Sequence, residues 1–331
     1  MTSTDTAPER VLGTGHAHGK VILLGEHTVV YGMPAIAIPA TGLKVEAVLH
    51  NSTASALMQP LSAPPSRSAG TMESKFVCSA DTVPAGSGVA AATAAALRRW
   101  DPRADRVEVH IRSVVPPARG LGSSAAAAAA AVRAVADRYG IPLDERSLYS
   151  LVQVGEKVAH GRASGVDAAA AIARGPIRFD AGITRPIRPI ADAVLVVADS
   201  GAAGCTRAAV DSVRAVLAED HANARRILTS AGRLADAATA ELEAGQLSAL
   251  GVRLNEFQGL LRELGVSTPQ LDRLIDVALR AGALGAKLTG GGLGGCLLAL
   301  TEPRHASTVR EALAAAGAAR TWIVPMTQDC R

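Results

Sequence analysis

Hydrophobic and polar positions follow patterns along most of the chain that predict a mixture of strands and helices. Alternating or short apolar runs bounded by turn residues indicate strands, and apolar positions with helical spacing indicate helices. The predicted strands cover residues 20–24, 42–50, 73–79, 107–115, 193–199, 286–289, 296–300 and 321–324. The predicted helices cover residues 89–100, 143–158, 166–173, 206–218, 221–244, 247–264, 269–281 and 306–316, and an alanine-rich helix that follows the candidate N-cap residues Ser123 and Ser124 and runs to about Tyr139.

Segments without periodicity divide this pattern. Residues 1–15 are expected to be a disordered lead-in, and residues 51–70, rich in Ser, Pro and Ala, a long surface loop. Residues 174–189 mix proline, glycine and basic residues, which favours a crossing between domains. We therefore expect an N-terminal domain over 16–180 and a C-terminal domain over 181–331.

Composition narrows the fold class. Alanine is abundant and aromatic residues make up only 2% of the 331 positions, so the cores are expected to pack small aliphatic side chains between helices and sheets. That favours an α/β or α+β architecture. The net charge of +4 comes from scattered basic residues, without the aromatic-interleaved basic stripe of a nucleic-acid binder, and suits an anionic substrate.

The cysteines and the N-terminus indicate a cytosolic protein. Cys78, Cys205, Cys296 and Cys330 stand far apart, without the spacing of a zinc site, and are expected to be free thiols. The N-terminus lacks an apolar signal core, and no apolar stretch approaches the length of a membrane span. The chain is therefore expected to be soluble and cytoplasmic.

The stretch P-P-A-R-G-L-G-S-S at 116–124 predicts a phosphate-binding loop that runs into a helix. Its prolines end the preceding strand, Gly120 and Gly122 permit positive φ, and Ser123 and Ser124 suit the start of the alanine-rich helix. Free amides at a helix start attract phosphate, and a serine hydroxyl there can hold magnesium. An ordinary capped loop remains the alternative.

Three further clusters of polar residues are candidate sites, each with a structural alternative. Lys20 begins an apolar strand, and Gly25 turns the chain after it, so that Glu26 and His27 lie near the end of this strand. The structural alternative is that Lys20 is a solvated surface lysine. Glu156 and Asp167 are candidate site carboxylates, although an aspartate in a first helical turn can simply complement the helix dipole. The glycine-rich turn at 290–295 indicates that a ligand or a neighbouring loop approaches its backbone closely, and its structural alternative is a hairpin in which glycine serves only the turn geometry.

These motifs occur in a recognisable order. H-G-K-V-I-L-L-G-E-H-T-V-V-Y-G at 18–32, P-P-A-R-G-L-G-S-S-A-A at 116–126, H-G-R-A-S-G-V-D at 160–167 and K-L-T-G-G-G-L-G-G-C at 287–296 carry the resemblance. The chain resembles the superfamily of galactokinases, homoserine kinases, mevalonate kinases and phosphomevalonate kinases over residues 15–325, and looks most similar to the mevalonate kinase family. It departs from that family at His18, where proline is usual, and at Leu293, where glycine is commoner.

The resemblance implies an α+β small-molecule kinase of two domains. The first would be similar to ribosomal protein S5 and the second to ferredoxin, with the active site in the cleft between them. It also implies transfer of the γ-phosphoryl of ATP to the 5-hydroxyl of mevalonate, with magnesium, in the mevalonate pathway of isoprenoid biosynthesis. A cytoplasmic homodimer without nucleic-acid or membrane partners is expected.

The resemblance also implies residue roles. Asp167 would be the catalytic base or an orienting group, with Lys20 beside it to stabilise charge on the hydroxyl oxygen. Ser124 and Glu156 would hold magnesium. The expected nucleotide contacts are Ser113, Ala118, Arg119, Gly120, Leu121, Gly122, Ser123 and Ser124. The expected substrate contacts are Lys20, Glu26, His27, Asp167, Thr206 and Thr289, with Arg207 as a candidate partner of the mevalonate carboxylate.

Two other readings stay open at this point. A sister kinase would act on phosphomevalonate or on the 3-hydroxyl of mevalonate. A catalytically silent member would bind ATP and a small ligand as a sensor, although the joint presence of Lys20, Glu156 and Asp167 argues against it.

Overall fold

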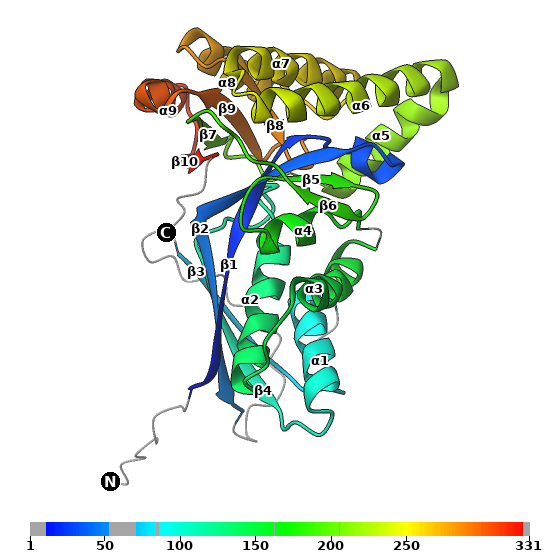
Figure 1. Cartoon of the computed structure of the whole chain (residues 1–331), viewed down its shortest axis with the longest axis vertical. Coiled ribbons are helices and arrows are strands. Elements are labelled where there is room, and N and C mark those ends of the chain that lie inside the picture. The colour runs from blue at the N-terminus through cyan, green and yellow to red at the C-terminus, as the bar shows by residue number, and fades with distance from the viewer. Residues whose placement is uncertain are drawn as a thin grey trace. The chain divides into compact units, whose positions relative to one another are not determined.

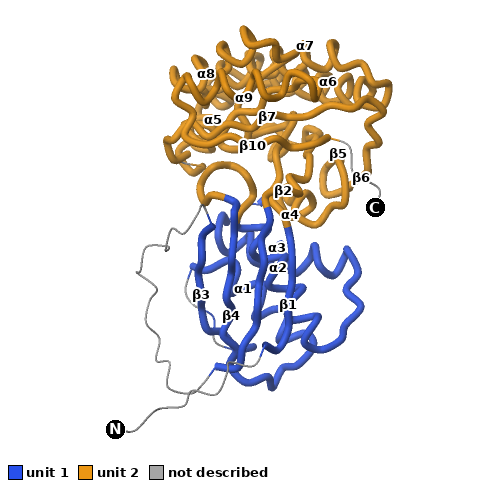
Figure 2. The backbone as a smooth tube through the Cα atoms, turned by 90° about the vertical axis from the view of Figure 1, so that its left-hand side faces the viewer, with its two compact units in different colours: residues 1–17, 44–115, 124–163 blue, residues 18–43, 116–123, 164–331 orange. Residues whose placement is uncertain are grey.

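The computed structural model of the chain describes residues 11–52, 71–81, 83, 86–161, 163–204 and 206–326. Cys205, Cys330, residues 1–10 of the predicted lead-in and residues 53–70 of the predicted loop lie outside these ranges. The chain forms two compact units, each built from several segments (Figure 2). Unit 1 comprises residues 1–17, 44–115 and 124–163, and unit 2 comprises residues 18–43, 116–123 and 164–331.

Three strand segments of unit 1 pair antiparallel: β3 (Met72–Cys78), β4 (Val107–Ser113) and the second part of β2 (Ala35–Asn51), in the order β3-β4-β2. The first part of β1 (Val11–Leu24) also belongs to this unit, and β1 pairs with β2. Val45 of β2 lies opposite Ser113, and Asn51 opposite Val107. Alternate residues of β4 are buried, which accounts for the apolar alternation that predicted this strand.

The described residues of unit 1 contain the helices α1 (Gly88–Trp100) and α3 (Glu145–His160) and, from its second residue on, α2 (Ser123–Arg138). Helices α1 and α3 lie side by side (Figure 1). The alanines of α2 are largely buried, so small side chains build this core as the composition predicted. Helix α3 begins where Asp144 accepts a hydrogen bond from the Ser147 amide.

Unit 2 contains a four-stranded antiparallel sheet in the order β10-β7-β9-β8. Its strands are β7 (Val194–Asp199), β8 (Gly285–Thr289), β9 (Cys296–Thr301) and β10 (Arg320–Pro325). Helices α7 (Leu247–Glu263), α8 (Pro269–Arg280) and α9 (Ala306–Ala315) pack on it. The remaining long helices are α5 (Thr206–Glu219) and α6 (His221–Glu243), and short 3-10 helices cover Thr28–Tyr31 and Pro303–His305.

Three segments differ from the expectations drawn from the sequence. Strand β2 begins at Ala35, whereas the expected strand covered only residues 42–50. Strand β1 spans Val11–Leu24, so residues 11–15 belong to a strand and not to a disordered lead-in. The expected crossing at 174–189 contains a hairpin of β5 (Ile177–Asp180) and β6 (Ile183–Pro186), and the first part of β2 pairs with β5. Strands of four residues are too short for a clear alternation to reveal them.

The two-domain fold with mixed helices and sheets agrees with the expected α+β class. The domain boundary expected near residue 180 remains a prediction. The compact units divide the chain differently, because residues 18–43 and 116–123 group with residues 164–331.

Candidate active site

Lys20 and Asp167 form the centre of the candidate site, within unit 2. Lys20 lies on β1, and Asp167 lies in the first turn of α4 (Val166–Ile172). Lys20 Nζ is 3.0 Å from Asp167 Oδ1 and donates a hydrogen bond of 3.0 Å to the Gly120 carbonyl oxygen. The Lys20 side chain is only 2% exposed and that of Asp167 is 37% exposed. A reacting hydroxyl could therefore reach the carboxylate while the buried ammonium stays fixed beside it.

The predicted phosphate loop lies directly against Lys20. The Lys20 amide donates to the Leu121 carbonyl at 3.0 Å. Gly122 has φ +72°, and a Cβ there would lie 2.8 Å from Lys20 Cγ, so only glycine fits. Helix α2 starts at Ser123, one of the two residues expected to cap it, so the helix begins slightly earlier than the sequence indicated. The first amides of a helix have no carbonyl partner within it and can bind phosphate oxygens.

The second glycine-rich turn joins β8 to β9 and approaches the phosphate loop. A Cβ on Gly290 would lie 2.5 Å from the Gly120 Cα atom. The close backbone approach expected at 290–295 is thus made by a neighbouring loop of the chain itself. Leu293 adopts φ +52° in this turn, which explains why glycine suits this position in the similar family.

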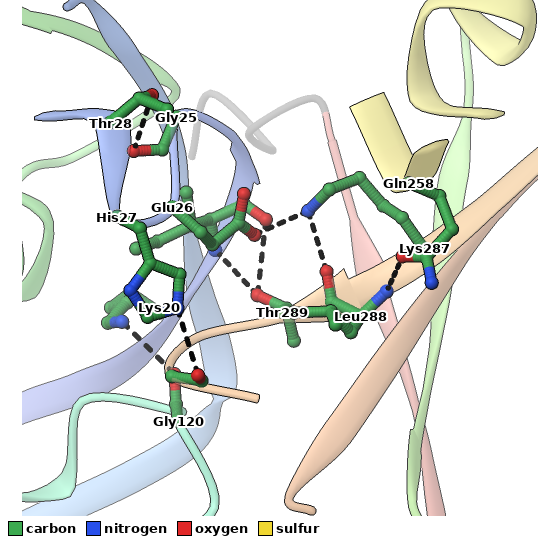
Figure 3. A network of polar contacts seen from close by, with 12 residues as sticks. Lys20, Gly25, Glu26, His27, Thr28, Gly120, Gln258, Lys287, Leu288 and Thr289 are labelled. Atoms are coloured by element: carbon green, nitrogen blue, oxygen red, sulfur yellow. Dashed lines mark hydrogen bonds and ion pairs between the residues drawn. The ribbon is translucent and has the colours of Figure 1, made fainter. Parts of the chain in front are cut away.

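Glu26 is paired with a residue that the sequence did not single out as part of the site. Its carboxylate forms a buried ion pair with Lys287 of β8, and the two side chains point toward one another (Figure 3). Burial raises the pKa of Glu26 and lowers the pKa of Lys287. The available signal was a lysine within the apolar strand 286–289, but its partner stands 261 positions away.

Thr289 also has partners within the chain. Its hydroxyl donates to the Ile22 carbonyl at 3.1 Å and accepts from the Ile22 amide at 3.0 Å. The residue is 1% exposed, so the hydroxyl links the end of β8 to β1.

His27 turns the chain after Glu26. Its backbone has φ +61°, in the left-handed region, and its Nε2 donates a hydrogen bond of 2.9 Å to the Gly291 carbonyl oxygen. Burial lowers the pKa of His27, which favours the neutral imidazole. With the proton on Nε2, the Nδ1 atom is a hydrogen-bond acceptor.

Arg119 adds a contact that the sequence did not predict. Its Nε donates to Asp199 Oδ2 at 2.9 Å, and Asp199 Oδ1 accepts from the Gly201 amide at 2.8 Å. Asp199 is 4% exposed at the end of β7. The guanidinium therefore ties the phosphate loop to this strand end.

Thr206 and Arg207 open α5 and are exposed. A Cβ on Gly291 would lie 3.2 Å from Thr206 Oγ1, so Thr206 borders the same turn that binds His27.

His18, where the similar family usually has proline, places its ring nitrogens 2.9 Å from the Gly19 carbonyl and 3.0 Å from the Ala173 carbonyl.

The predicted metal ligands Ser124 and Glu156 both lie in unit 1. Ser124 is in the first turn of α2, and Glu156 is a buried residue of α3 with His160 Nε2 4.0 Å from its Oε2 atom. The described part of the chain has no group of three or more His, Cys, Asp or Glu residues that could hold a metal ion alone. A hydroxyl and a carboxylate fit magnesium that also binds phosphate oxygens, because this ion commonly takes few protein ligands.

Ser113, a predicted nucleotide contact, ends β4. Its hydroxyl accepts from the Val115 amide at 3.0 Å and so shapes the chain that leads to the phosphate loop.

In the part of the chain that the structure describes, none of the helices has the length and apolar character needed to span a membrane.

Comparisons with known proteins show which sequences and folds this chain is similar to. Residues 88–175 match the family described as GHMP kinases N terminal domain, and residues 238–319 match GHMP kinases C terminal. The mevalonate kinase of Aeropyrum pernix is 34% identical over 86% of this chain and 87% of its own length. That of Pyrococcus horikoshii is 36% identical over 87% of this chain and 88% of its own.

Among solved structures, the fold is similar to L. major mevalonate kinase in complex with R-mevalonate. The TM-score is 0.78 at 26% identity, covering 96% of this chain and 97% of that one.

Proposed function

The chain belongs to the GHMP kinase family, and from that premise we propose that it transfers the γ-phosphoryl group of ATP to the 5-hydroxyl of mevalonate. The products would be 5-phosphomevalonate and ADP. The observation that carries the proposal is the Lys20–Asp167 pair beside the phosphate loop, in a chain whose relatives are named mevalonate kinases.

The pair supplies what phosphoryl transfer needs at the attacking oxygen. A bond forms between the 5-oxygen and the γ-phosphorus while the bond from that phosphorus to the bridging oxygen of ADP breaks. Asp167 orients the hydroxyl and receives its proton, and Lys20 stabilises negative charge on the oxygen. Because Lys20 is buried and bound to Gly120, its ammonium is already in place before substrate binds.

The phosphate loop would bind the nucleotide. Amides of residues 118–124 are proposed to surround the phosphates, with Ser113 as a further nucleotide contact. The glycines of this loop support the assignment, because they allow backbone to approach phosphate closely.

Ser124 and Glu156 are the proposed magnesium ligands. When bound, the ion would neutralise charge on the phosphates of ATP. Ser124 would contribute a neutral oxygen and Glu156 a charged one, the hard ligands that magnesium prefers.

On the acceptor side, His27 and Thr206 are the proposed contacts of mevalonate beside Lys20 and Asp167, with Arg207 as the partner of its carboxylate. His27 Nδ1 can accept a hydrogen bond from a hydroxyl, and Thr206 and Arg207 are exposed. Glu26 and Thr289 are each 1% exposed and bound within the chain, which favours a supporting role for them. We also propose a cytoplasmic homodimer, on the family resemblance.

An ATP-consumption assay with mevalonate, phosphomevalonate, galactose and homoserine side by side tests this function. We expect turnover with mevalonate above that with the other three. Preference for phosphomevalonate would favour the sister kinase, and nucleotide binding without turnover on any alcohol would favour the silent sensor. Either result would overturn the proposal.

A further inference from the structure

Lys287 is the charged residue of the buried strand β8, and the mechanism above does not use it. All five residues of β8 are buried, and the Lys287 side chain is 0% exposed. Its ammonium donates to Glu26 and to the Leu288 carbonyl and lies 5.6 Å from the centroid of the Phe257 ring. No substrate can reach an ammonium enclosed in this way.

Stability alone is a weak reason for such a pair. Removing two charges from water is costly, and apolar residues of similar volume often fill the same space with equal or greater stability. What apolar side chains do not supply is a directed contact between two defined atoms. A buried ion pair can therefore fix how two segments lie against each other.

The segment that Lys287 contacts includes a backbone conformation that needs support. His27 directly follows Glu26 and has φ +61°, which a residue with a Cβ atom rarely adopts unless its surroundings hold it there. Lys287 binds Glu26 (Figure 3), and the Gly291 carbonyl binds His27. Lys287 and Gly291 thus contact both members of the Glu26-His27 turn.

We propose that Lys287 is a positioning residue, which acts through Glu26 to hold the His27 turn in the geometry that binds the acceptor alcohol. This rests on the proposed function, because it assigns His27 to the mevalonate side. The phosphate loop is held by hydrogen bonds that involve neither Lys287 nor Glu26: Leu121 binds Lys20, and Arg119 binds Asp199. Loss of the Lys287–Glu26 ion pair should therefore weaken mevalonate binding far more than ATP binding.

The double variant Lys287→Met/Glu26→Leu removes both charges without leaving either one buried alone. We expect a folded protein with a Tm within about 4 °C of the wild type. Its KM for mevalonate should rise about tenfold or more while its KM for ATP changes less than about twofold. The control is Arg112→Met/Glu73→Leu, which removes an exposed cross-strand ion pair in unit 1 and should change neither KM.

A second variant keeps the proposal testable if the double variant does not fold. Glu26→Asp retains the charge but withdraws the carboxylate from Lys287, and should give the same selective rise in the KM for mevalonate. Unchanged KM values in whichever folded variant is measured, or equal rises for both substrates, would overturn the positioning role.

The wild-type assay separates this inference from the proposed function. If the wild type phosphorylates galactose or homoserine instead of mevalonate, the proposed function fails. The same variants are then measured with that alcohol. A selective rise in the KM for that alcohol would support the positioning role, and an unchanged KM would overturn it.

Discussion

The ammonium of Lys20 lies 3.0 Å from Asp167 Oδ1, and the two side chains differ sharply in exposure. The Lys20 side chain extends from β1, packs against Gly122 of the phosphate loop and is almost fully buried. Asp167 lies on the short helix α4 and remains accessible. The pair therefore joins a fixed positive charge to a carboxylate that a substrate can approach. The first two predictions test each side of this relationship.

Asp167→Asn should lower turnover by on the order of 10²-fold or more, the contribution usual for a general base. The amide keeps the size of the side chain but cannot take up the proton. ATP affinity, measured by calorimetry on the same variant, should stay close to that of the wild type. Near-normal turnover would remove the assignment of Asp167.

Gly122→Ala should displace Lys20 and reduce kcat/KM by on the order of 10²-fold, because its new Cβ would overlap the buried Lys20 side chain. Gly140→Ala is the matched control. Gly140 also has positive φ but has no atom within 4 Å of the Cβ position, so only backbone strain should result. Steady-state kinetics of the two variants should differ accordingly, and equal losses would argue against the packing of Gly122 on Lys20.

Arg119→Gln should lower the free energy of unfolding by about 1–3 kcal/mol, because it leaves the buried Asp199 carboxylate without its guanidinium. The KM for ATP should rise as the phosphate loop loosens. Arg214→Gln removes an exposed ion pair with Asp211 and should cost less than about 1 kcal/mol. Urea denaturation checks both values. A similar small cost for both variants would contradict the role of Asp199 in anchoring the loop.

His27 should make stability depend on pH. Its pKa is lowered in the folded state from an ordinary value near 6.5, so the unfolded state binds the proton more readily. The contribution of His27 to stability is then complete above about pH 6.5 and is lost as the pH falls toward the lowered pKa.

We expect the decrease in Tm between pH 7.5 and pH 5.5 to be smaller in His27→Asn than in the wild type. Asparagine tolerates the left-handed backbone and does not titrate in this range. An equal decrease in both proteins would show that His27 does not carry the effect.

Local patterns in the sequence predicted several features of the fold and the site. The glycine-rich turn between β8 and β9 and a helix beginning near Ser123 and Ser124 follow from turn residues and apolar runs near each other in the chain. The hairpin at 177–186 has strands of only four residues each, too short for an alternation to stand out.

The partners of buried charges could not be predicted in the same way. Glu26 forms an ion pair with Lys287, and Arg119 forms one with Asp199, only because segments far apart in the sequence fold together. The sequence identified Glu26 and Arg119 as candidates, and Lys287 stood out within a predicted strand, but no local signal linked Glu26 to Lys287 or Arg119 to Asp199. These contacts change Glu26 from an expected substrate contact to a proposed support of the His27 turn.

The most direct test of the proposed activity is the phosphorus NMR spectrum of the product formed from mevalonate and ATP, recorded without proton decoupling. The 5-oxygen is attached to a methylene carbon, so its phosphate resonance is split by the protons of that carbon. The 3-oxygen is attached to a carbon without hydrogen, so its phosphate would not show that splitting. We predict the split resonance, together with stoichiometric ADP. An unsplit product resonance, or no phosphorylated mevalonate while ATP binds, would contradict phosphoryl transfer to the 5-hydroxyl.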